Sequence, residues 1–245
     1  MKTMQPKMAS ALVGALFAMA GLTAHAAGMQ PESTVVLIQE ADGEGSMVVT
    51  NTDAAPSLMY AKIEAVSDDP NPPVVLTPPV ARVDPGKKQT VRFMLTNKEP
   101  LAVERYARVT FDGIPEQKND GKNKVTLTVR QDLPIVIRPK ALAEDKTPWT
   151  HLKWSLNGDT LTVANDSAYV VRMDQRVKLL PGDIEAAMPK SYVVPGSKVE
   201  IKLKDGAALK NAQQVQITPF SAYGYALEPY TVQLGNATVE TTATN

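Results

Sequence analysis

The stretch VTLTVRQDLPIVIRPKAL, residues 125–142, decides the fold. Apolar and polar side chains alternate at its start, and a β-strand has this side-chain period of two, so Val125, Leu127 and Val129 are expected on one face. Pro134 cannot donate to a sheet ladder, which indicates either an edge position or a break in the strand. A row of aliphatic side chains on an exposed edge invites pairing with another chain.

The start of the chain has the layout of a secretory signal peptide. Lys2 and Lys7 precede an apolar run that extends from Met8 to about Leu22, and small residues follow up to Ala26. We therefore interpret residues 1–26 as a signal peptide that is cleaved after Ala26. The run is too short to span a membrane comfortably, although an anchor at the start of the chain is the alternative interpretation.

Charge and cysteine content narrow the classes of protein. The chain carries 26 basic and 26 acidic residues, and loss of the signal peptide removes two lysines and no acid. This balance gives no electrostatic reason to expect nucleic acid or a membrane surface as a partner. The chain has no cysteine, although an exported protein usually meets conditions that permit disulfides. The fold must therefore depend on core burial, and the chain is long enough for two domains.

Short strand-like runs separated by turn residues fill the chain from Thr34 onward. Asp84-Pro85-Gly86 is a strong turn signal of this kind. Closely spaced strands without a convincing helix predict an all-β chain built of antiparallel sandwiches. The pattern stops around residues 140–148 and then resumes, which indicates a second, smaller β domain. The expected organisation is a signal peptide over 1–26, a first domain over 27–141, a second over 142–236 and a disordered tail over 237–245.

No pattern of catalytic or metal-binding residues emerges. Of the two histidines, His25 lies in the expected signal peptide, so only His151 remains in the mature chain. One histidine without any cysteine cannot form a zinc cluster. No serine has a G-x-S-x-G context, and no glycine-rich phosphate loop precedes a predicted helix. We therefore expect a protein that is not an enzyme and that uses no metal, cofactor, nucleic acid or small-molecule substrate.

Five stretches carry a family resemblance. They are TPPVARVDPGKKQTVRF (77–93), ERYARVTFDGIPE (104–116), LTVRQDLPIVIRPKAL (127–142), LNGDTLTVANDSAYVV (156–171) and FSAYGY (220–225). The first three resemble the hallmark motifs of PapD-like periplasmic pilus chaperones, and the last two resemble the second domain of that family. The resemblance covers nearly all of the mature chain. It implies two immunoglobulin-like domains set at an angle, with a cleft between them.

The resemblance also implies a function. Members of this family bind newly exported pilin subunits, which lack their last strand, and lend one of their own strands. On this interpretation Val125, Leu127 and Val129 form the donor strand, and an outer-membrane usher receives the subunit in the periplasm. Because bare edges tend to pair, a dimer in which the free protein caps its own edge is a further hypothesis.

Two other classes of protein remain as alternatives. One is a secreted immunoglobulin-like pilin or adhesin module whose edge strand pairs permanently in a fibre. Such a subunit is expected to carry a free donor extension, and residues 26–34 are short and lack an alternating apolar row. The other is a carbohydrate-processing or carbohydrate-binding sandwich, which needs clustered aromatic or acidic residues that the sequence does not display.

The sequence departs from the family at the residues that hold the subunit's terminal carboxylate. The two basic residues that members use in the cleft align with Thr34 and Pro134. We therefore expect carboxylate anchoring to be lost, weakened or moved to another basic residue. Arg130 and Arg138 are the candidates, and a structural salt bridge is the preferred role for Arg138.

A second departure concerns the ionic cluster between the domains of this family. Glu104 aligns with its acid and Arg138 with its base. The acid of the second domain aligns with Ala222, so an ionic pair without its third member is expected.

Overall fold

The computed structural model describes residues 28–116, 128–203 and 208–235. The expected signal peptide and the expected tail therefore lie outside the described residues. The same holds for Val125 and Leu127. None of the helices in the described ranges is long and apolar enough to cross a membrane.

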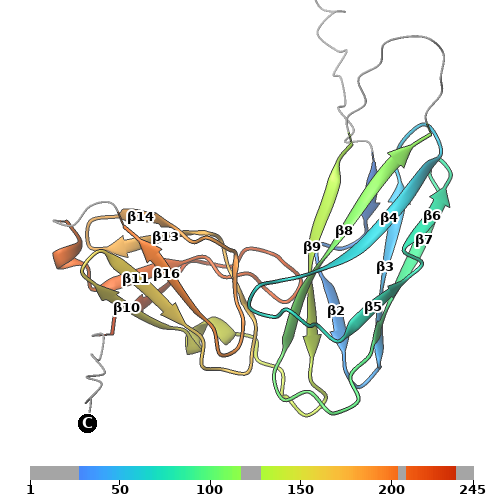
Figure 1. The fold of residues 1–245 in the computed structure, drawn as a ribbon. Coiled ribbons are helices and arrows are strands. Elements are labelled where there is room, and N and C mark those ends of the chain that lie inside the picture. The colour runs from blue at the N-terminus through green and yellow to red at the C-terminus, as the bar shows by residue number, and fades with distance from the viewer. Residues whose placement is uncertain (1–27, 117–127, 204–207, 236–245) are drawn as a thin grey trace, which may run out of the picture.

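The first domain packs a four-stranded sheet against a five-stranded sheet (Figure 1). The four-stranded sheet has the order β1-β3-β7-β5, formed by Met29–Pro31, Glu44–Asn51, Lys88–Leu95 and Val74–Thr77. The five-stranded sheet has the order β2-β9-β8-β4-β6, formed by Val36–Gln39, Arg130–Arg138, Arg105–Pro115, Ser57–Ala65 and Val80–Val83. The space between the sheets is filled by aliphatic and aromatic side chains that include Phe93, Phe111, Ile135 and Ile137.

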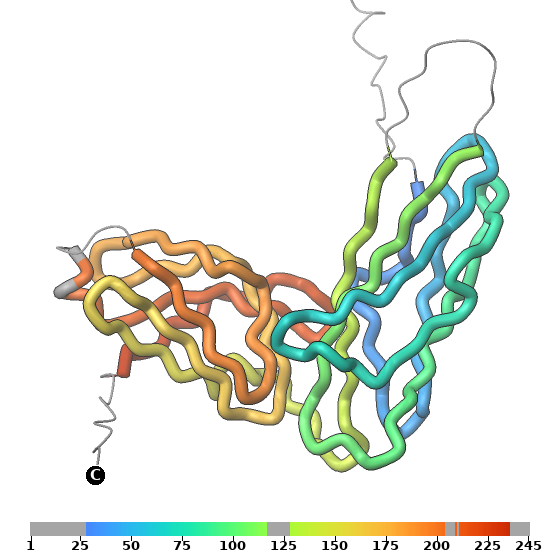
Figure 2. The backbone as a smooth tube through the Cα atoms, in the orientation of Figure 1, coloured from blue at the N-terminus to red at the C-terminus, as the bar shows by residue number. Residues whose placement is uncertain are grey.

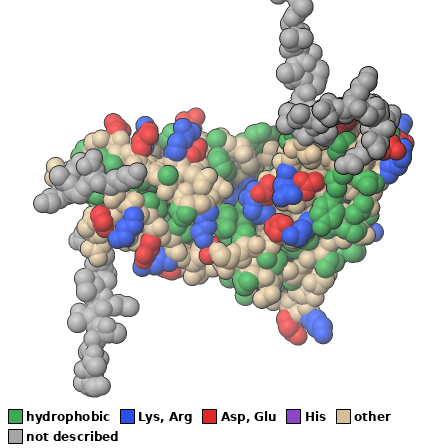
Figure 3. All heavy atoms as spheres, turned by 45° about the horizontal axis from the view of Figure 1, so that its top comes forward, with side chains coloured by type: hydrophobic (Ala, Val, Ile, Leu, Met, Phe, Trp, Pro, Cys, Tyr) green, Lys and Arg blue, Asp and Glu red, His purple; other side chains and the backbone are tan. Residues whose placement is uncertain are grey.

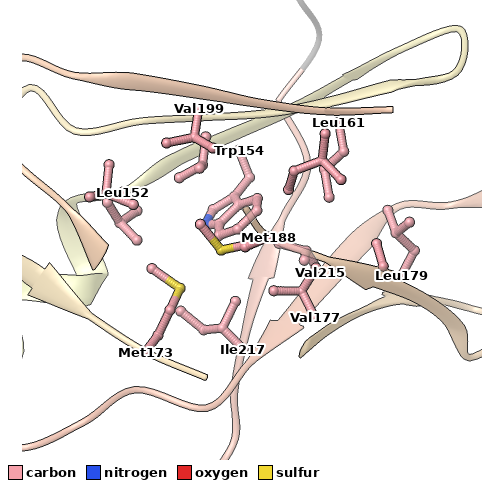
Figure 4. Close-up of a cluster of buried hydrophobic side chains, with 14 of the residues drawn as sticks. Leu152, Trp154, Leu161, Met173, Val177, Leu179, Met188, Val199, Val215 and Ile217 are labelled. Carbon is pink, nitrogen blue, oxygen red and sulfur yellow. The ribbon is translucent and has the colours of Figure 1, made fainter. Parts of the chain in front are cut away.

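The second domain is also a sandwich, and its core surrounds Trp154 (Figure 4). One sheet has the order β10-β11-β16, formed by Lys153–Asn157, Thr160–Ala164 and Lys198–Lys202. The other has the order β14-β13-β17-β18, formed by Ile184–Ala187, Arg176–Leu180, Gln214–Ile217 and Tyr230–Gln233. The remaining elements are the paired strands β12 (Val171–Arg172) and β15 (Tyr192–Val193) and the short 3₁₀ turns Pro148–His151 and Ala208–Asn211.

Alternation along the strands explains these sheets. In β4, Ser57, Met59 and Ala61 are buried while Leu58 and Tyr60 between them are exposed, as expected for a strand with one face on a core. At the predicted turn, Gly86 has a φ of 68°, which glycine adopts without a steric penalty. The prediction of an all-β chain with two immunoglobulin-like domains is confirmed.

The two domains meet at an angle through an apolar contact (Figure 1). The Tyr106 ring of the first domain lies 4.3 Å from the Tyr192 ring of the second, measured between centroids. In Figure 2 the loop after β4 reaches across to the second domain, and its Asp68 forms an ion pair with Lys190. The buried members of this contact are Val35, Val66, Tyr106, Val136, Val170, Tyr192 and Val194.

Candidate functional site

Half of β9 forms an open sheet edge. From Arg130 to Ile137 β9 pairs with β8 on one side. On the other side it pairs in parallel with β2, which covers only Ile135–Arg138. Among the described residues, positions 130–134 therefore have a neighbouring strand on one side only. Their backbone groups on the free side are available to another strand.

A crossover in the N-terminal segment leaves this edge open. β1 pairs with β3 in the four-stranded sheet, whereas β2 joins the five-stranded sheet. The chain passes from one sheet to the other between Pro31 and Val36. Pro134 occupies the last position before β2 covers the edge, and β9 runs through it without a break. Of the two alternatives for Pro134, the structure therefore shows the edge position.

Val129 is the one residue of the expected donor row that the structure describes. It lies directly before β9, and 44% of its surface is exposed. Along β9, Ile135 and Ile137 are fully buried in the core of the first domain and Leu133 packs against it. On this face of the strand Gln131 separates Val129 from the apolar row of Leu133, Ile135 and Ile137. Val129 therefore shares the core-facing side of the strand but lies beyond the row that fills the core.

The outward face of the five-stranded sheet carries charged pairs beside this edge. Arg130 lies opposite Asp112 in the register, and its Nε donates to the Asp112 Oδ1 atom over 2.8 Å. Arg108 lies opposite Pro134 and donates to Asp132 over 2.7 Å and to the Tyr106 hydroxyl over 3.2 Å. Arg130, one candidate for anchoring a carboxylate, is therefore already ion-paired.

The positions aligned with the family's basic anchors carry no charge here. The Thr34 Oγ1 atom donates to the Tyr223 carbonyl over 2.9 Å, which ties the start of β2 to the second domain. A Cβ atom at Gly224 would lie 2.5 Å from that same Oγ1 atom, and Gly224 has a φ of 85°. The close approach and the positive φ both require glycine at the position after Tyr223.

The expected ionic pair between the domains is formed by a buried acid, Glu104, and a partly buried base, Arg138. Only 5% of the Glu104 surface is exposed. Its Oε1 atom accepts from the Arg138 Nε over 3.1 Å, and its Oε2 atom accepts from the Val170 N–H of the second domain over 2.8 Å. Burial raises the pKa of Glu104, and the hydrogen bonds from Val170 and Arg138 oppose that effect. Glu104 therefore joins the two domains directly.

Glu144, in the segment that links the domains, takes the place of the missing third member. Its Oε1 atom lies 3.7 Å from the Arg138 Nη1 atom. Nothing in the sequence distinguishes Glu144 from the other charged residues of the linker, since its role depends on how the linker folds back on β9. Ala222, which aligns with the missing acid, lines a cavity between the two domains.

The cavity between the two domains has a volume of about 270 Å³. Leu37 and Val136 of the first domain, Trp149 of the linker, and Phe220 and Leu227 of the second domain give it apolar walls. Arg172 of β12 also lines it, and sequence reasoning missed this residue. An arginine inside the apolar run YVVRM is the signal that could have found it, because a buried arginine needs a partner.

A second exposed surface lies on the outward face of β4, β6 and β8. Leu58 lies opposite Ile114, and Tyr60 lies opposite Val80 in the registers of these strands. All four are exposed, and cross-strand neighbours such as these form a continuous apolar surface. Figure 3 shows hydrophobic side chains gathered on the first domain beside a cluster of acidic and basic side chains. We call Leu58, Tyr60, Val80 and Ile114 the apolar patch.

The described residues contain no group of three or more His, Cys, Asp or Glu side chains that could hold a metal ion. His151, the histidine of the linker, accepts or donates a hydrogen bond at Nε2 with the Asp145 carboxylate over 2.7 Å.

Comparison with known proteins places both domains in one family. Residues 28–143 match the model of the pili and flagellar-assembly chaperone, PapD N-terminal domain. Residues 147–241 match that of the pili assembly chaperone PapD, C-terminal domain.

Curated relatives and solved structures agree with this assignment. The chain is 39% identical to the uncharacterized fimbrial chaperone YhcA of Escherichia coli K12, over 89% of this chain and 96% of the relative. It is 29% identical to the chaperone protein FimB/FhaD of Bordetella pertussis, over 87% and 93%. A structure of the Salmonella enterica SafA pilin in complex with the SafB chaperone shares the fold, with a TM-score of 0.70, 18% identity and coverage of 84% of this chain and 96% of that one. The protein therefore belongs to the pilus assembly chaperones that combine a PapD N-terminal with a PapD C-terminal domain.

Proposed function

We propose that this chaperone binds incomplete pilus subunits by adding a strand of the subunit to the free edge of β9. The observation that carries the proposal is the edge at residues 130–134, which β8 pairs on one side and β2 leaves uncovered on the other. In this mode of recognition main-chain hydrogen bonds contribute affinity, and alternate side chains select the partner. A solved relative with the same fold is a complex between a pilin and its chaperone, which supports the same class of partner here.

The free energy of subunit binding is expected to come mainly from burial of the donor row. Burial of an aliphatic side chain contributes about 1.5–3 kcal/mol. Val125, Leu127 and Val129 together would therefore contribute about 5–9 kcal/mol on entering the groove of a subunit. A single charge-assisted hydrogen bond to an anchoring residue contributes about 1.5–3 kcal/mol. Strand addition therefore supplies most of the attraction even though Thr34 and Pro134 carry no charge.

The test is an intact-mass analysis of what co-purifies with the tagged mature protein from the periplasm of its native host. We expect a stoichiometric partner of pilin size, which is lost in Val129→Glu and in Leu127→Glu because a charge would enter an apolar groove. Val75→Glu is the matched control, since Val75 is 46% exposed on β5, at the edge of the opposite sheet. Unchanged recovery of the subunit with both donor variants would refute strand donation.

The same purification separates this function from the self-assembling alternative. A pilin or adhesin module would be recovered as a ladder of its own multiples. A dimer that caps the free edge would be recovered as a pair of copies, would dissociate on dilution and would be displaced by a subunit. We propose that the protein acts as a single copy whose free β9 edge receives the subunit.

We further propose that the apolar patch is the surface that meets the outer-membrane usher. The patch lies on the outward face of β4, β6 and β8, whereas the free edge lies along β9. An exposed apolar surface of this kind marks a protein contact. Leu58→Glu with Ile114→Glu should retain the subunit and lose binding to the usher in a pull-down. Loss of the subunit instead would assign the patch to subunit binding.

Export is the remaining part of the proposal. Members of this family work in the periplasm, and we propose that the signal peptide over residues 1–26 delivers the protein there. The intact mass of the periplasmic protein tests this, because cleavage after Ala26 leaves Ala27 as the first residue.

A further inference from the structure

The free edge of β9 carries two side chains of opposite charge. Among residues 128–134 only Arg130 and Asp132 are charged, and their side chains are 63% and 48% exposed. They lie two positions apart, so both point to the outward face of the five-stranded sheet. The edge therefore presents a positive and then a negative group along β9, on the face opposite to the one that holds Val129.

The backbone groups of these two residues point to the open side of the strand. The Arg138 carbonyl accepts a hydrogen bond from the Glu40 N–H over 2.9 Å, so it points to the side of β2. Backbone groups of alternate residues point to the same side of a strand, and the pairing with β8 has no bulge from Arg130 to Ile137. Arg130 and Asp132 share the parity of Arg138. A guest strand on the open side therefore forms main-chain hydrogen bonds with these two residues.

Charges already alternate between neighbouring strands on this face. Arg130 donates to Asp112, directly opposite it on β8, over 2.8 Å, and Arg108 of β8 donates to Asp132 over 2.7 Å. One strand further, Glu64 of β4 lies opposite Arg108. Opposite charges in cross-strand positions stabilise a sheet, and like charges directly opposite each other destabilise it. A guest strand that continues this alternation places an acid opposite Arg130 and a base opposite Asp132.

The aliphatic row alone leaves the register of a guest strand incompletely specified. A slip by one residue moves every side chain to the other face. A slip by two keeps the faces, and the row of Val125, Leu127 and Val129 offers similar side chains at each step. The same slip brings either a base opposite Arg130 or an acid opposite Asp132, which is a like-charge pair. The charge order therefore separates registers that the aliphatic row does not.

We propose that Arg130 and Asp132 select the subunit strand and its register by pairing with an acidic and a basic side chain two residues apart on that strand. This proposal rests on strand addition at β9 and deepens it by naming the class of strand that fits. The residues of that strand on the side of Val129 are apolar, and the outward residues carry the acid and the base. The contact joins side chains and needs no chain end. Because both pairs are exposed, they contribute more to discrimination than to affinity.

The first experiment exchanges the two charges. Arg130→Asp with Asp132→Arg reverses their order and keeps the net charge. Variant and differently tagged wild type compete in one periplasm for the subunit that co-purifies with wild type. We expect recovery by the exchanged variant to fall about tenfold, and Arg130→Gln with Asp132→Asn to give an intermediate value. The control is Lys198→Glu with Glu200→Lys, which exchanges an exposed pair of the same spacing on the edge strand β16 and should leave recovery unchanged.

The second experiment measures the register. The chain has no cysteine, so a photo-crosslinker attached at Gln131→Cys lies between the two charged residues, and mass spectrometry identifies the subunit residue that it reaches. With the native charges we expect links centred on one residue of the subunit strand. With Arg130→Gln and Asp132→Asn we expect additional links two positions away, because the registers are then no longer separated.

Two outcomes would overturn the proposal. Equal recovery by the exchanged variant, with one unchanged register, would show that the charges only keep the free edge from pairing with other copies. Reduced recovery with an unchanged register and a lower melting temperature would show that the exchange acts by breaking the pairs with Asp112 and Arg108. A failure of strand donation differs from both, because Val129→Glu then retains the subunit and position 131 forms no link to it.

Discussion

The two halves of β9, residues 130–134 and 135–138, form one continuous strand but have opposite environments. From Ile135 to Ile137 the strand is paired on both sides, and Ile135 and Ile137 are fully buried. From Arg130 to Pro134 it is paired on one side, and Val129 just before it is exposed. The comparison teaches that the apolar row alone does not decide whether a residue belongs to the core. Burial is complete where β2 covers the strand, whereas Leu133 in the uncovered half only packs against the core while partly exposed.

The largest expected effect is at the covered end of the strand, where Arg138 meets Glu104. Glu104→Ala leaves the Arg138 guanidinium buried without its partner and removes the acceptor of the Val170 N–H. We expect a loss of about 3–5 kcal/mol in the free energy of unfolding, together with a looser angle between the domains. Chemical denaturation and small-angle scattering measure the two effects.

The control is Asp166→Ala, which removes an exposed ion pair with Lys153 and should cost less than about 1 kcal/mol. A scattering profile identical to wild type would show that Glu104 does not hold the angle.

The second prediction compares the two halves directly. Ile137→Ala opens a cavity in the core and should cost about 2–5 kcal/mol of stability. Val129→Ala removes a side chain that is already half exposed and should change stability by about 0.5 kcal/mol or less. Subunit binding should show the reverse order, with the greater loss of affinity in Val129→Ala. Equal destabilisation by the two variants would mean that Val129 belongs to the core of the free protein.

The third and smallest effect concerns Glu40, which fastens the covered end of β9. Its carboxylate accepts from the N–H groups of Lys140 and Leu101 and from the Asn97 amide, each over 2.8 Å. The hydrogen bond from Lys140 lowers the pKa of Glu40, with burial acting in the opposite direction and Leu101 and Asn97 adding to the decrease. A lowered pKa means that this stabilisation is fully present above about pH 4.5, the unfolded value, and is lost as the pH falls through the folded value.

Glu40→Gln should therefore cost about 1–2 kcal/mol near neutral pH and much less in acid. Denaturation curves at pH 7 and at pH 3 measure this, with Glu200→Gln as a control because Glu200 forms an exposed pair with Lys198. The same loss for Glu40→Gln at both pH values would show that the charge of Glu40 contributes nothing.

The sequence predicted the elements more fully than their connections. The alternation and turn residues were sufficient for two β-sandwiches, and Pro134 indicated an edge. Whether Pro134 lies at an edge or at a break depends on where β2 pairs with β9. That pairing joins residues about 100 positions apart in the sequence. The same limitation applies to Arg172 and Glu144, since their partners come from distant segments. Thr34 and Pro134 were identified as departures by aligning the sequence with the family, whereas the position of the buried Arg172 in the cavity depends on how the two domains pack.

The crossover between β1 and β2 sets the length of the open edge. Five residues of β9 lie beyond the reach of β2, and at a strand rise of about 3.3 Å per residue they span about 16 Å. Moving the crossover by one residue toward the N-terminus would lengthen β2 and shorten that span by one step. Relatives could therefore change how much of a guest strand they accommodate through insertions or deletions in a surface turn, without altering the core of either domain.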